Sequence, residues 1–312
     1  MSKLSAADDL LHPPAMDDRW WSETYWFSFD VPGENVSATI YPLFRPNLGI
    51  CSLGLFLWDA SGHQPWNCLY GRNYWHLAMP TMPATKLRVE GLSYDCLETL
   101  QRYHVQYHDE DLLDLDLEYI GVRPPHEAGI GGGVGHFDQV CHVTGEISVR
   151  SRRIVVDSLG MRDRTWSPRP EYRRGHGTAY TFGHSGPDEQ FLAMTKLDGN
   201  NGSFISGVFT GYLVRDGIEA PLVDSSRRVT ERREGYPVAL EIEAADSMGR
   251  KLEAVGRTVN RFANQATPSQ FAWLSMTTWE VAGRPGDFYG EDQEVWSPDQ
   301  LGAPLQSLNR PL

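Results

Sequence analysis

The stretch Leu113-Asp-Leu-Asp-Leu-Glu-Tyr119 alternates apolar and acidic residues along its whole length. Successive side chains of a β-strand point to opposite faces, so this period of two predicts a strand with one buried and one solvated face. The same alternation recurs in the segments 103–107, 147–150 and 238–244. Strands with one polar face are typical of antiparallel sheets.

Short turn sequences separate these segments, among them Asp59–Gly62, Asp216-Gly217 and Asp246–Gly249. Thirty glycines and twenty prolines are spread through the chain and leave few windows long enough for a helix. The spacing of strands and turns predicts an all-β fold, an antiparallel sandwich or barrel. Helix is expected only in short pieces such as 6–11 and 298–301.

The charge balance restricts the partners of the chain. Its 312 residues include 28 Lys and Arg against 41 Asp and Glu, so the formal net charge is −13. This excess disfavours binding to nucleic acids and to anionic membrane surfaces. The longest apolar stretch, residues 50–58, is too short to cross a bilayer, and the first residues do not read as a signal peptide. We therefore expect a cytoplasmic protein with no membrane insertion.

The spacing of potential metal ligands predicts a metal-free protein. The four cysteines, Cys51, Cys68, Cys96 and Cys141, are scattered and form no CxxC pair. They are expected to be reduced thiols rather than disulfides or zinc ligands. The histidines form no HxH or HExxH pattern.

A glycine-rich run, residues 129–135, divides the chain. It lacks the spacing of a phosphate-binding loop and is followed by a predicted strand rather than a helix. With Pro124-Pro125 before it, the run reads as a linker, or alternatively as a flexible lid over a pocket. The predicted organisation is an arm at 1–19, a first β domain at 20–127, a linker at 128–135 and a second β domain at 136–312.

The densest cluster of reactive side chains is Gly160-Met-Arg-Asp-Arg-Thr-Trp166. If the preceding strand continues through it, Asp163 and Thr165 face one way, and Arg162, Arg164 and Trp166 face the other. An Asp in an aromatic-lined interior has a raised pKa and can serve as a general acid or base. The alternative is a buried Asp–Arg pair that only joins two sheets. The sequence leaves both interpretations open.

Histidines and aromatic residues complete the candidate site. His136, His142 and His184 flank the cluster in sequence and could supply a second acid or base. Ten tryptophans are many for this length, and a barrel with a cavity would use such residues to hold an apolar ligand, although many must be core. The candidate substrate-binding residues are Trp20, Trp21, Tyr25, Trp26, Trp58, Trp75, Trp166 and Trp279.

A series of motifs resembles a known superfamily. The motifs are Trp20–Phe29, His136–Gln139, Gly160–Trp166, Arg215–Gly217, Asp246–Arg250, Trp279 and Tyr289–Trp296. In this order they resemble the two-domain lipocalin-like superfamily of the carotenoid 1,2-hydratases (hydroxyneurosporene synthases) and tocopherol cyclases, and most closely a bacterial branch of it. Its motif usually reads RD[RH]SWG, and Asp163 matches the proposed catalytic aspartate of the hydratases. Arg164 stands where those hydratases have histidine, and Ser167 where the superfamily usually has glycine.

The resemblance implies two lipocalin-like barrels or half-barrels packed together, no organic cofactor, and acid–base chemistry on an apolar substrate. The expected activity is that of a cofactor-independent lyase or isomerase, by hydration, dehydration or related C–O or C–C cleavage of an aromatic or terpenoid-like small molecule. Asp163 would transfer the proton, and Arg162 and Arg164 would orient a substrate oxygen or pair with a carboxylate. A non-catalytic carrier of hydrophobic ligands and a pericyclic cyclase are the alternatives, and a homodimer is compatible with either.

Overall fold

The computed structural model of the chain describes residues 4–170, 177–197, 204–267 and 270–297. The chain divides into two compact units, one formed by Met1–Ser61 with Pro65–Pro170 and the other by Gly62–Gln64 with Glu171–Leu312. Strands dominate both units, and the only helices in the described part are short 3₁₀ turns. The predicted all-β class with little helix is confirmed, while the expected piece at 298–301 lies outside the described residues.

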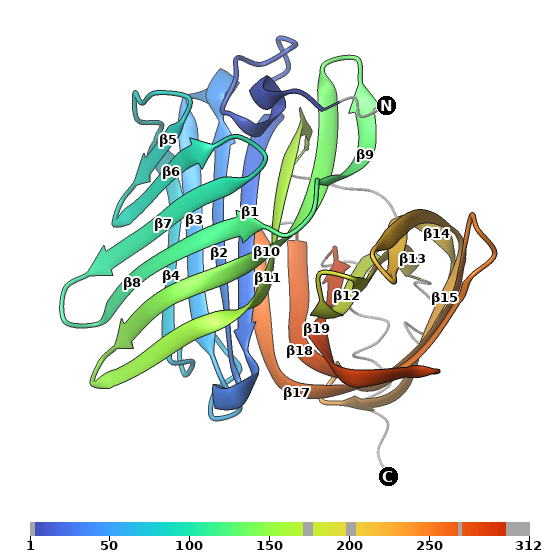
Figure 1. Cartoon of the computed structure of the whole chain (residues 1–312). Helices are drawn as coiled ribbons and strands as arrows, with labels where there is room; N and C mark the ends of the chain where they lie inside the picture. The colour runs from blue at the N-terminus through green and yellow to red at the C-terminus, as the bar shows by residue number, and fades with distance from the viewer. Residues whose placement is uncertain (1–3, 171–176, 198–203, 268–269, 298–312) are drawn as a thin grey trace. The chain divides into compact units, whose positions relative to one another are not determined.

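The first unit is one large, curled antiparallel sheet (Figure 1). Its strands follow the order β4-β3-β2-β1-β11-β10-β8-β7-β6-β5, and β9 pairs with β10 off this path. Its elements are η1 (Ala6–Asp9), β1 (Trp21–Val31), η2 (Pro32–Glu34), β2 (Val36–Arg45), η3 (Pro46–Leu48), β3 (Ile50–Trp58), β4 (Tyr70–Ala78), β5 (Lys86–Val89), β6 (Leu92–Glu98), β7 (Arg102–Asp109), β8 (Leu113–Gly121), β9 (His126–Gly131), β10 (Val134–Val149) and β11 (Arg152–Pro168).

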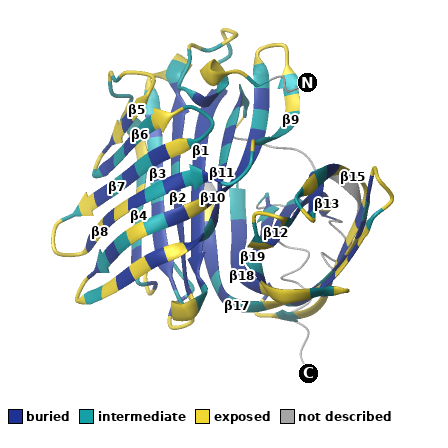
Figure 2. Ribbon diagram, viewed as in Figure 1, coloured by how far each residue is buried: buried dark blue, intermediate teal, exposed yellow. Residues whose placement is uncertain are grey.

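The core of the first unit lies inside the curl of this sheet. In Figure 1, β5–β8 cross in front of β1–β4, and the side chains between them form one apolar cluster. Phe27 of β1, for example, lies 5.4 Å from the Tyr94 ring of β6 and 5.3 Å from the Tyr119 ring of β8. The alternation predicted for 113–119 is present, and β8 shows alternating buried and exposed residues in Figure 2. We call the face toward this cluster the inner face and the opposite one the outer face.

The second unit contains a closed antiparallel barrel in which each strand pairs with its neighbour in sequence and β12 pairs with β19. Its strands are β12 (Thr178–Gly186), β13 (Glu189–Leu197), β14 (Phe204–Arg215), β15 (Ile218–Arg233), β16 (Tyr236–Asp246), β17 (Lys251–Thr267), β18 (Gln270–Val281) and β19 (Arg284–Trp296). Buried Arg227 pairs with Asp292 and with Glu294, the latter at 2.8 Å. The predicted turn Asp216-Gly217 joins β14 to β15 with positive φ at both residues.

The predicted linker at 128–135 is wrong. Residues 126–131 and 134–149 form β9 and β10, which pair with each other. Gly132 and Gly133 connect them, and both have positive φ, the combination that a two-residue type I′ turn requires. The glycines therefore make a tight hairpin, and the division between the units follows Pro170, so β10 and β11 belong to the first unit.

Three further sequence expectations concern membrane spans, the cysteines and metal sites. Among the described residues, no helix is long and apolar enough to cross a membrane. The four cysteines are free thiols. Within the described part of the chain, no group of three or more His, Cys, Asp or Glu side chains is arranged to hold a metal ion.

Candidate functional site

The motif Gly160–Trp166 lies in β11, in the middle of the first unit's sheet. This strand pairs with β1 on one side and with β10 on the other. Because side chains alternate along it, Arg162, Arg164 and Trp166 point to the inner face, and Asp163 and Thr165 point to the outer face. This is the alternation that the sequence predicts, and it separates the arginines from the aspartate between them.

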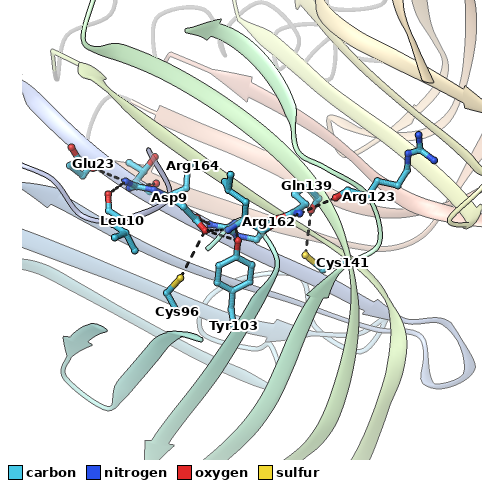
Figure 3. Close-up of polar contacts among 12 residues, drawn as sticks. Asp9, Leu10, Glu23, Cys96, Tyr103, Arg123, Gln139, Cys141, Arg162 and Arg164 are labelled. Atoms are coloured by element: carbon cyan, nitrogen blue, oxygen red, sulfur yellow. Dashed lines mark hydrogen bonds and ion pairs between the residues drawn. The ribbon is translucent and has the colours of Figure 1, made fainter. Parts of the chain in front are cut away.

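On the inner face, Arg162 is fully buried and bound to the N-terminal arm (Figure 3). Its Nη2 lies 2.6 Å from Oδ1 of Asp9, and its Nη1 donates to the Tyr103 hydroxyl at 2.5 Å. The second oxygen of Asp9 accepts hydrogen bonds from the Tyr103 hydroxyl and from the backbone N–H of Leu100. The arginine is thereby compensated by a carboxylate that lies far away in sequence, and not by Asp163.

Arg164 is compensated in the same way. Its Nη2 lies 3.0 Å from Oε2 of Glu23 and donates to the Leu10 carbonyl at 2.6 Å. Its guanidinium also lies 3.9 Å from the centre of the Tyr25 ring, a favourable cation–π contact. Arg162 and Arg164 thus lie on the opposite face from Asp163, which differs from the expectation that they orient a substrate beside it.

On the outer face, six side chains form two adjacent rows across three strands. The first row is Trp26, Asp163 and Asp138, and the second is Thr24, Thr165 and His136. Residues directly opposite in an antiparallel sheet share a face, with Cβ atoms about 5 Å apart. The sheet therefore places His136 and two carboxyl groups together on this surface, and β9 places His126 directly opposite Asp138. We call the six side chains of the two rows, together with Tyr41 and Arg169, the Asp163 patch.

His136 is held between two partners in the Asp163 patch. Its Nδ1 lies 2.8 Å from the Thr165 hydroxyl, and its Nε2 lies 3.0 Å from Oδ1 of Asp138. Burial lowers the pKa of His136, but the Asp138 carboxylate outweighs this effect and raises the pKa to about 9. At neutral pH the ring is an imidazolium, so Nδ1–H donates to Thr165 and the charged ring lies beside the Asp138 carboxylate.

Asp163 differs from the other carboxylates of this region because it has no hydrogen bond or ion pair to any described residue. Burial raises the pKa of Asp163 to about 6, and the Asp138 carboxylate adds to the rise, while His136 and Arg169 oppose it. The side chain is partly exposed. It can therefore hold a proton near neutral pH and exchange it with a molecule bound on this face.

The remaining two members of the patch, Tyr41 and Arg169, lie at its edge. The Trp26 and Tyr41 rings meet edge to face, with centres 5.2 Å apart. Arg169, immediately after β11, donates from Nη1 to the Thr24 hydroxyl at 3.3 Å and to the Tyr41 hydroxyl at 3.2 Å. Its guanidinium therefore lies over the same outer face as Asp163.

The other two candidate histidines lie elsewhere. His142 is on the outer face of β10, but it is exposed and pairs with Asp157 at 2.7 Å, six residues along the strand from His136. His184 belongs to β12 of the second unit, where it is buried against Phe182 and lies 4.6 Å from the Tyr289 ring. Of the three histidines, only His136 is in the Asp163 patch.

The candidate substrate-binding aromatics are divided among several places. Trp21, Tyr25 and Trp166 are buried on the inner side as core. Trp26 and Trp58 lie on the outer face and are also buried. Trp20 lies beneath the Arg19 guanidinium, Trp75 is exposed on β4, and Trp279 packs on Phe191 inside the second unit's barrel. Only Trp26 stands directly beside Asp163.

One hollow of the first unit is not lined by these aromatics. It has a volume of about 940 Å³ and lies over the exposed outer face of β6–β8, β10 and β11. Its lining includes the charged or titratable side chains His108, Asp114 and Arg153 as well as the apolar Leu115 and Val155. Trp21, Tyr25 and Trp166 pack in apolar core clusters and do not line this hollow, so an aromatic-lined cavity in this half stays a prediction.

Asp138, Arg169 and Tyr41 are among the members of the Asp163 patch that the sequence analysis did not single out. Asp138 stands two residues after His136, so the period of two places both on one face, and this spacing was the available signal. Arg169 follows Asp163 at an even spacing, so the alternation of faces, continued just past the end of β11, places both side chains on the outer face. Tyr41 carries no local signal, because its position depends on the pairing of β2 with β1.

The fold and the patch define the class of protein as a two-unit, lipocalin-like β-protein with a desolvated carboxyl group on its first sheet. The chain belongs to the family described as a domain of unknown function, DUF7064, which matches residues 5–291. No protein with a curated description matches the chain in sequence.

Three solved structures are similar to the chain. One is a protein from Nitrosomonas europaea provisionally described as AttH, with 15% identity, a TM-score of 0.63, and coverage of 88% of this chain and 91% of that chain. The second is CghA, with 12% identity, a TM-score of 0.62, and coverage of 89% and 88%. The third is kievitone hydratase from Nectria haematococca, with 10% identity, a TM-score of 0.58, and coverage of 94% and 95%. At these identities the likenesses show that the fold is shared.

Proposed function

We propose that this protein is a cofactor-independent lyase, most specifically a hydratase or dehydratase, that acts on an apolar aromatic or terpenoid-like small molecule. Asp163 is its proton-transferring group. The observation that carries the proposal is the state of this carboxyl group, which is unpaired among the described residues, partly exposed, and raised in pKa to about 6. A purely structural aspartate would be expected to pair with a neighbouring arginine.

The neighbours of Asp163 support this role. The Asp138 carboxylate opposes ionisation of Asp163, which keeps the acid form populated near neutral pH. His136, fixed by Thr165 and Asp138, is a second proton-bearing group on the same face. Trp26 gives the patch an apolar wall against which a ring or an alkene can lie.

The chemistry balances with water as the co-reactant. In hydration, the Asp163 carboxyl proton adds to one carbon of a C=C bond, the π electrons form the new C–H bond, and water attacks the cationic carbon to form a C–O bond. The attacking water then returns its extra proton to the Asp163 carboxylate. Dehydration is the reverse, and general acid catalysis of this kind contributes about 10²–10⁴-fold in rate.

The similar structures support the class of reaction. One of them is named as a hydratase, and CghA has also been solved with Sch210972, at a TM-score of 0.60. The fold thus occurs in a protein named for adding water and in one that has been solved with a small organic molecule. The alternative, a carrier that binds such a ligand without chemistry, makes no use of a desolvated, unpaired acid.

The test uses solvent deuterium. The protein is incubated in D₂O with a panel of aromatic and terpenoid-like alkenes, and products are searched by mass spectrometry for added D₂O with one deuterium on carbon. Asp163→Asn should abolish incorporation, whereas Asp157→Asn should not, because Asp157 lies exposed on the same face of the same strand and pairs with His142. Ligand binding without incorporation by the wild type would favour the carrier.

A further inference from the structure

We propose that Arg169 is a substrate-binding residue that holds an oxygen atom of the substrate, with Tyr41 as its partner. The substrate would then be an aromatic molecule bearing an acidic oxygen, as a phenolate, an enolate or a carboxylate. This inference rests on the proposed function of Asp163 and adds the substrate class and the group that orients it.

The geometry places Arg169 at the border of the Asp163 patch. Its Nη1 reaches both Thr24 and Tyr41, which fixes the guanidinium over the outer face. The charge of Arg169 acts on both Asp163 and His136, lowering the pKa of each. Arg169 and Asp163 therefore lie on one surface, near enough to contact different parts of one small molecule.

Arg169 also has spare donors. A guanidinium carries five N–H groups, and the side-chain hydrogen bonds that Arg169 makes to described residues involve only Nη1. Unlike Arg162 and Arg164, it has no carboxylate within ion-pair distance among the described residues. A partly buried guanidinium in this state is suited to bind an anionic oxygen with two parallel N–H donors.

The side chains that would contact the substrate are accessible to solvent. Asp163, Thr165, His136, Tyr41 and Arg169 are each partly exposed, whereas the next residues along β1 and β2 on this face, Ser28 and Thr39, are buried. A bound molecule would therefore contact the acid at one end and the guanidinium at the other. The space between them is bordered by the Trp26 and Tyr41 rings.

A second observation points to an oxygen acceptor at the same place. Trp26 is more than nine-tenths buried, and its indole N–H has no acceptor among the described residues. A buried donor without a partner costs about 1–3 kcal/mol, so such groups usually meet a ligand or an ordered water. The Trp26 donor and the free Arg169 donors both favour an oxygen-rich ligand.

The charges favour an anionic oxygen. Below about pH 6, where Asp163 is mostly in its acid form, Arg169 and the His136 imidazolium face the single negative charge of Asp138, which leaves one positive charge in excess. A neutral hydrocarbon gains nothing from that excess, whereas a phenolate, an enolate or a carboxylate neutralises it.

The experiment compares three probes that share one ring system. Naphthalene, 2-naphthol and 2-naphthoate are tested for binding by equilibrium dialysis, using wild type, Arg169→Gln, Arg169→Lys and Tyr41→Phe. The wild type should bind at least one oxygenated probe about tenfold or more tightly than naphthalene, and Arg169→Gln should remove most of this difference while naphthalene binding stays the same. Arg169→Lys should retain part of the preference, and Tyr41→Phe should reduce it less.

The matched control is Arg153→Gln, since Arg153 is an exposed arginine on the outer face of the same strand, paired with Glu146. It should leave all three affinities unchanged. If the wild type prefers neither oxygenated probe, or if Arg169→Gln and Arg153→Gln behave alike in folded protein, the inference is overturned. Preference for 2-naphthol over 2-naphthoate assigns a phenol-like oxygen, and the reverse assigns a carboxylate.

The two proposals fail separately. Asp163→Asn should keep the Arg169-dependent preference, because probe binding needs no proton transfer. If that preference exists but deuterium incorporation does not depend on Asp163, the proposed catalytic role falls and the oxygen site stands. If incorporation depends on Asp163 but the preference is absent, only the Arg169 inference falls.

Discussion

The two faces of β11 use similar residues for opposite purposes. On the inner face, Arg162 and Arg164 are fully buried and each meets a carboxylate, Asp9 or Glu23, within 3.0 Å. On the outer face, Asp163 has no such partner among the described residues, and burial raises its pKa to about 6. One strand thus carries two compensated charges on one side and an uncompensated acid on the other.

This difference shows that adjacency in sequence is a poor guide to pairing within a strand. A strand sends neighbouring residues to opposite faces, so Asp163 cannot reach the arginine on either side of it. A paired charge chiefly holds a fold together, whereas an unpaired and desolvated acid is available for chemistry. The comparison therefore predicts that substitutions on the two faces separate activity from stability.

The largest effect is expected for Asp163→Asn. Removing the proton-transferring group while keeping its shape should lower turnover by about 10²–10⁴-fold. The melting temperature at neutral pH should not fall and should rise by a few degrees, because no ion pair to a described residue is lost and Asn removes the cost of burying an ionised carboxylate. Turnover per folded molecule and thermal unfolding, measured on the same preparation, check this. A variant with normal turnover and a much lower melting temperature would assign Asp163 to the fold instead.

On the inner face, Arg162→Met should give the reverse result. Asp9 is then left buried without its guanidinium, which should destabilise the first unit by about 3–5 kcal/mol. For a unit of this size the melting temperature should fall on the order of 10 °C, whereas turnover per folded molecule should change little. Arg153→Met, in an exposed pair with Glu146, is the matched control and should leave the melting temperature almost unchanged.

The pH dependence of stability should differ between Asp163 and His136. The folded-state pKa of Asp163, about 6, lies above its ordinary 3.8, so its contribution is full below pH 4 and is lost as the pH rises through 6. The folded-state pKa of His136, about 9 against 6.5, gives a contribution that is lost as the pH rises through 9. Asp163→Asn should remove the first decline, worth about 1–3 kcal/mol, and keep the second. Chemical denaturation between pH 4 and 10 measures both, and an unchanged first decline would contradict the assignment.

The smallest effect is expected for Thr165→Val, which removes the hydroxyl that holds Nδ1 of His136. Loss of one such hydrogen bond is worth about 0.5–1.5 kcal/mol, so turnover should fall roughly two- to tenfold. The pKa of the His136 ring, followed by NMR titration, should remain raised because Asp138 is still present. A pKa near 6.5 in this variant would show that Thr165 contributes more than positioning.

Local sequence patterns predicted the strands and the faces on which their side chains lie, because both depend on residues that are neighbours in sequence. The alternation in 113–119 predicted β8, and the same rule predicted that Asp163 and Thr165 share a face. Gly132 and Gly133 were misread as part of a linker because flexible linkers and type I′ turns both require glycine. The distinction depends on whether the flanking strands pair with each other, and composition does not report that.

Long-range partners could not be predicted in the same way. Asp9 compensates Arg162 across 153 residues, and nothing near either residue indicates the other. Tryptophans were equally ambiguous, since Trp166 serves the core and Trp26 borders the Asp163 patch, although both are buried aromatics on paired strands. The sheet order, in which β1 pairs with β11, decides these placements.

That pairing also sets the order in which the first unit can be completed during synthesis. At about 5–20 residues per second, Arg162 leaves the ribosome roughly ten to thirty seconds after Asp9. Throughout this interval the edge of β1 that later pairs with β11 is open. Asp9 and Glu23 then lack the arginines that later compensate their charges. We expect nascent chains that stop after β8 to be degraded or bound by chaperones, and chains that extend past β11 to become resistant to proteases.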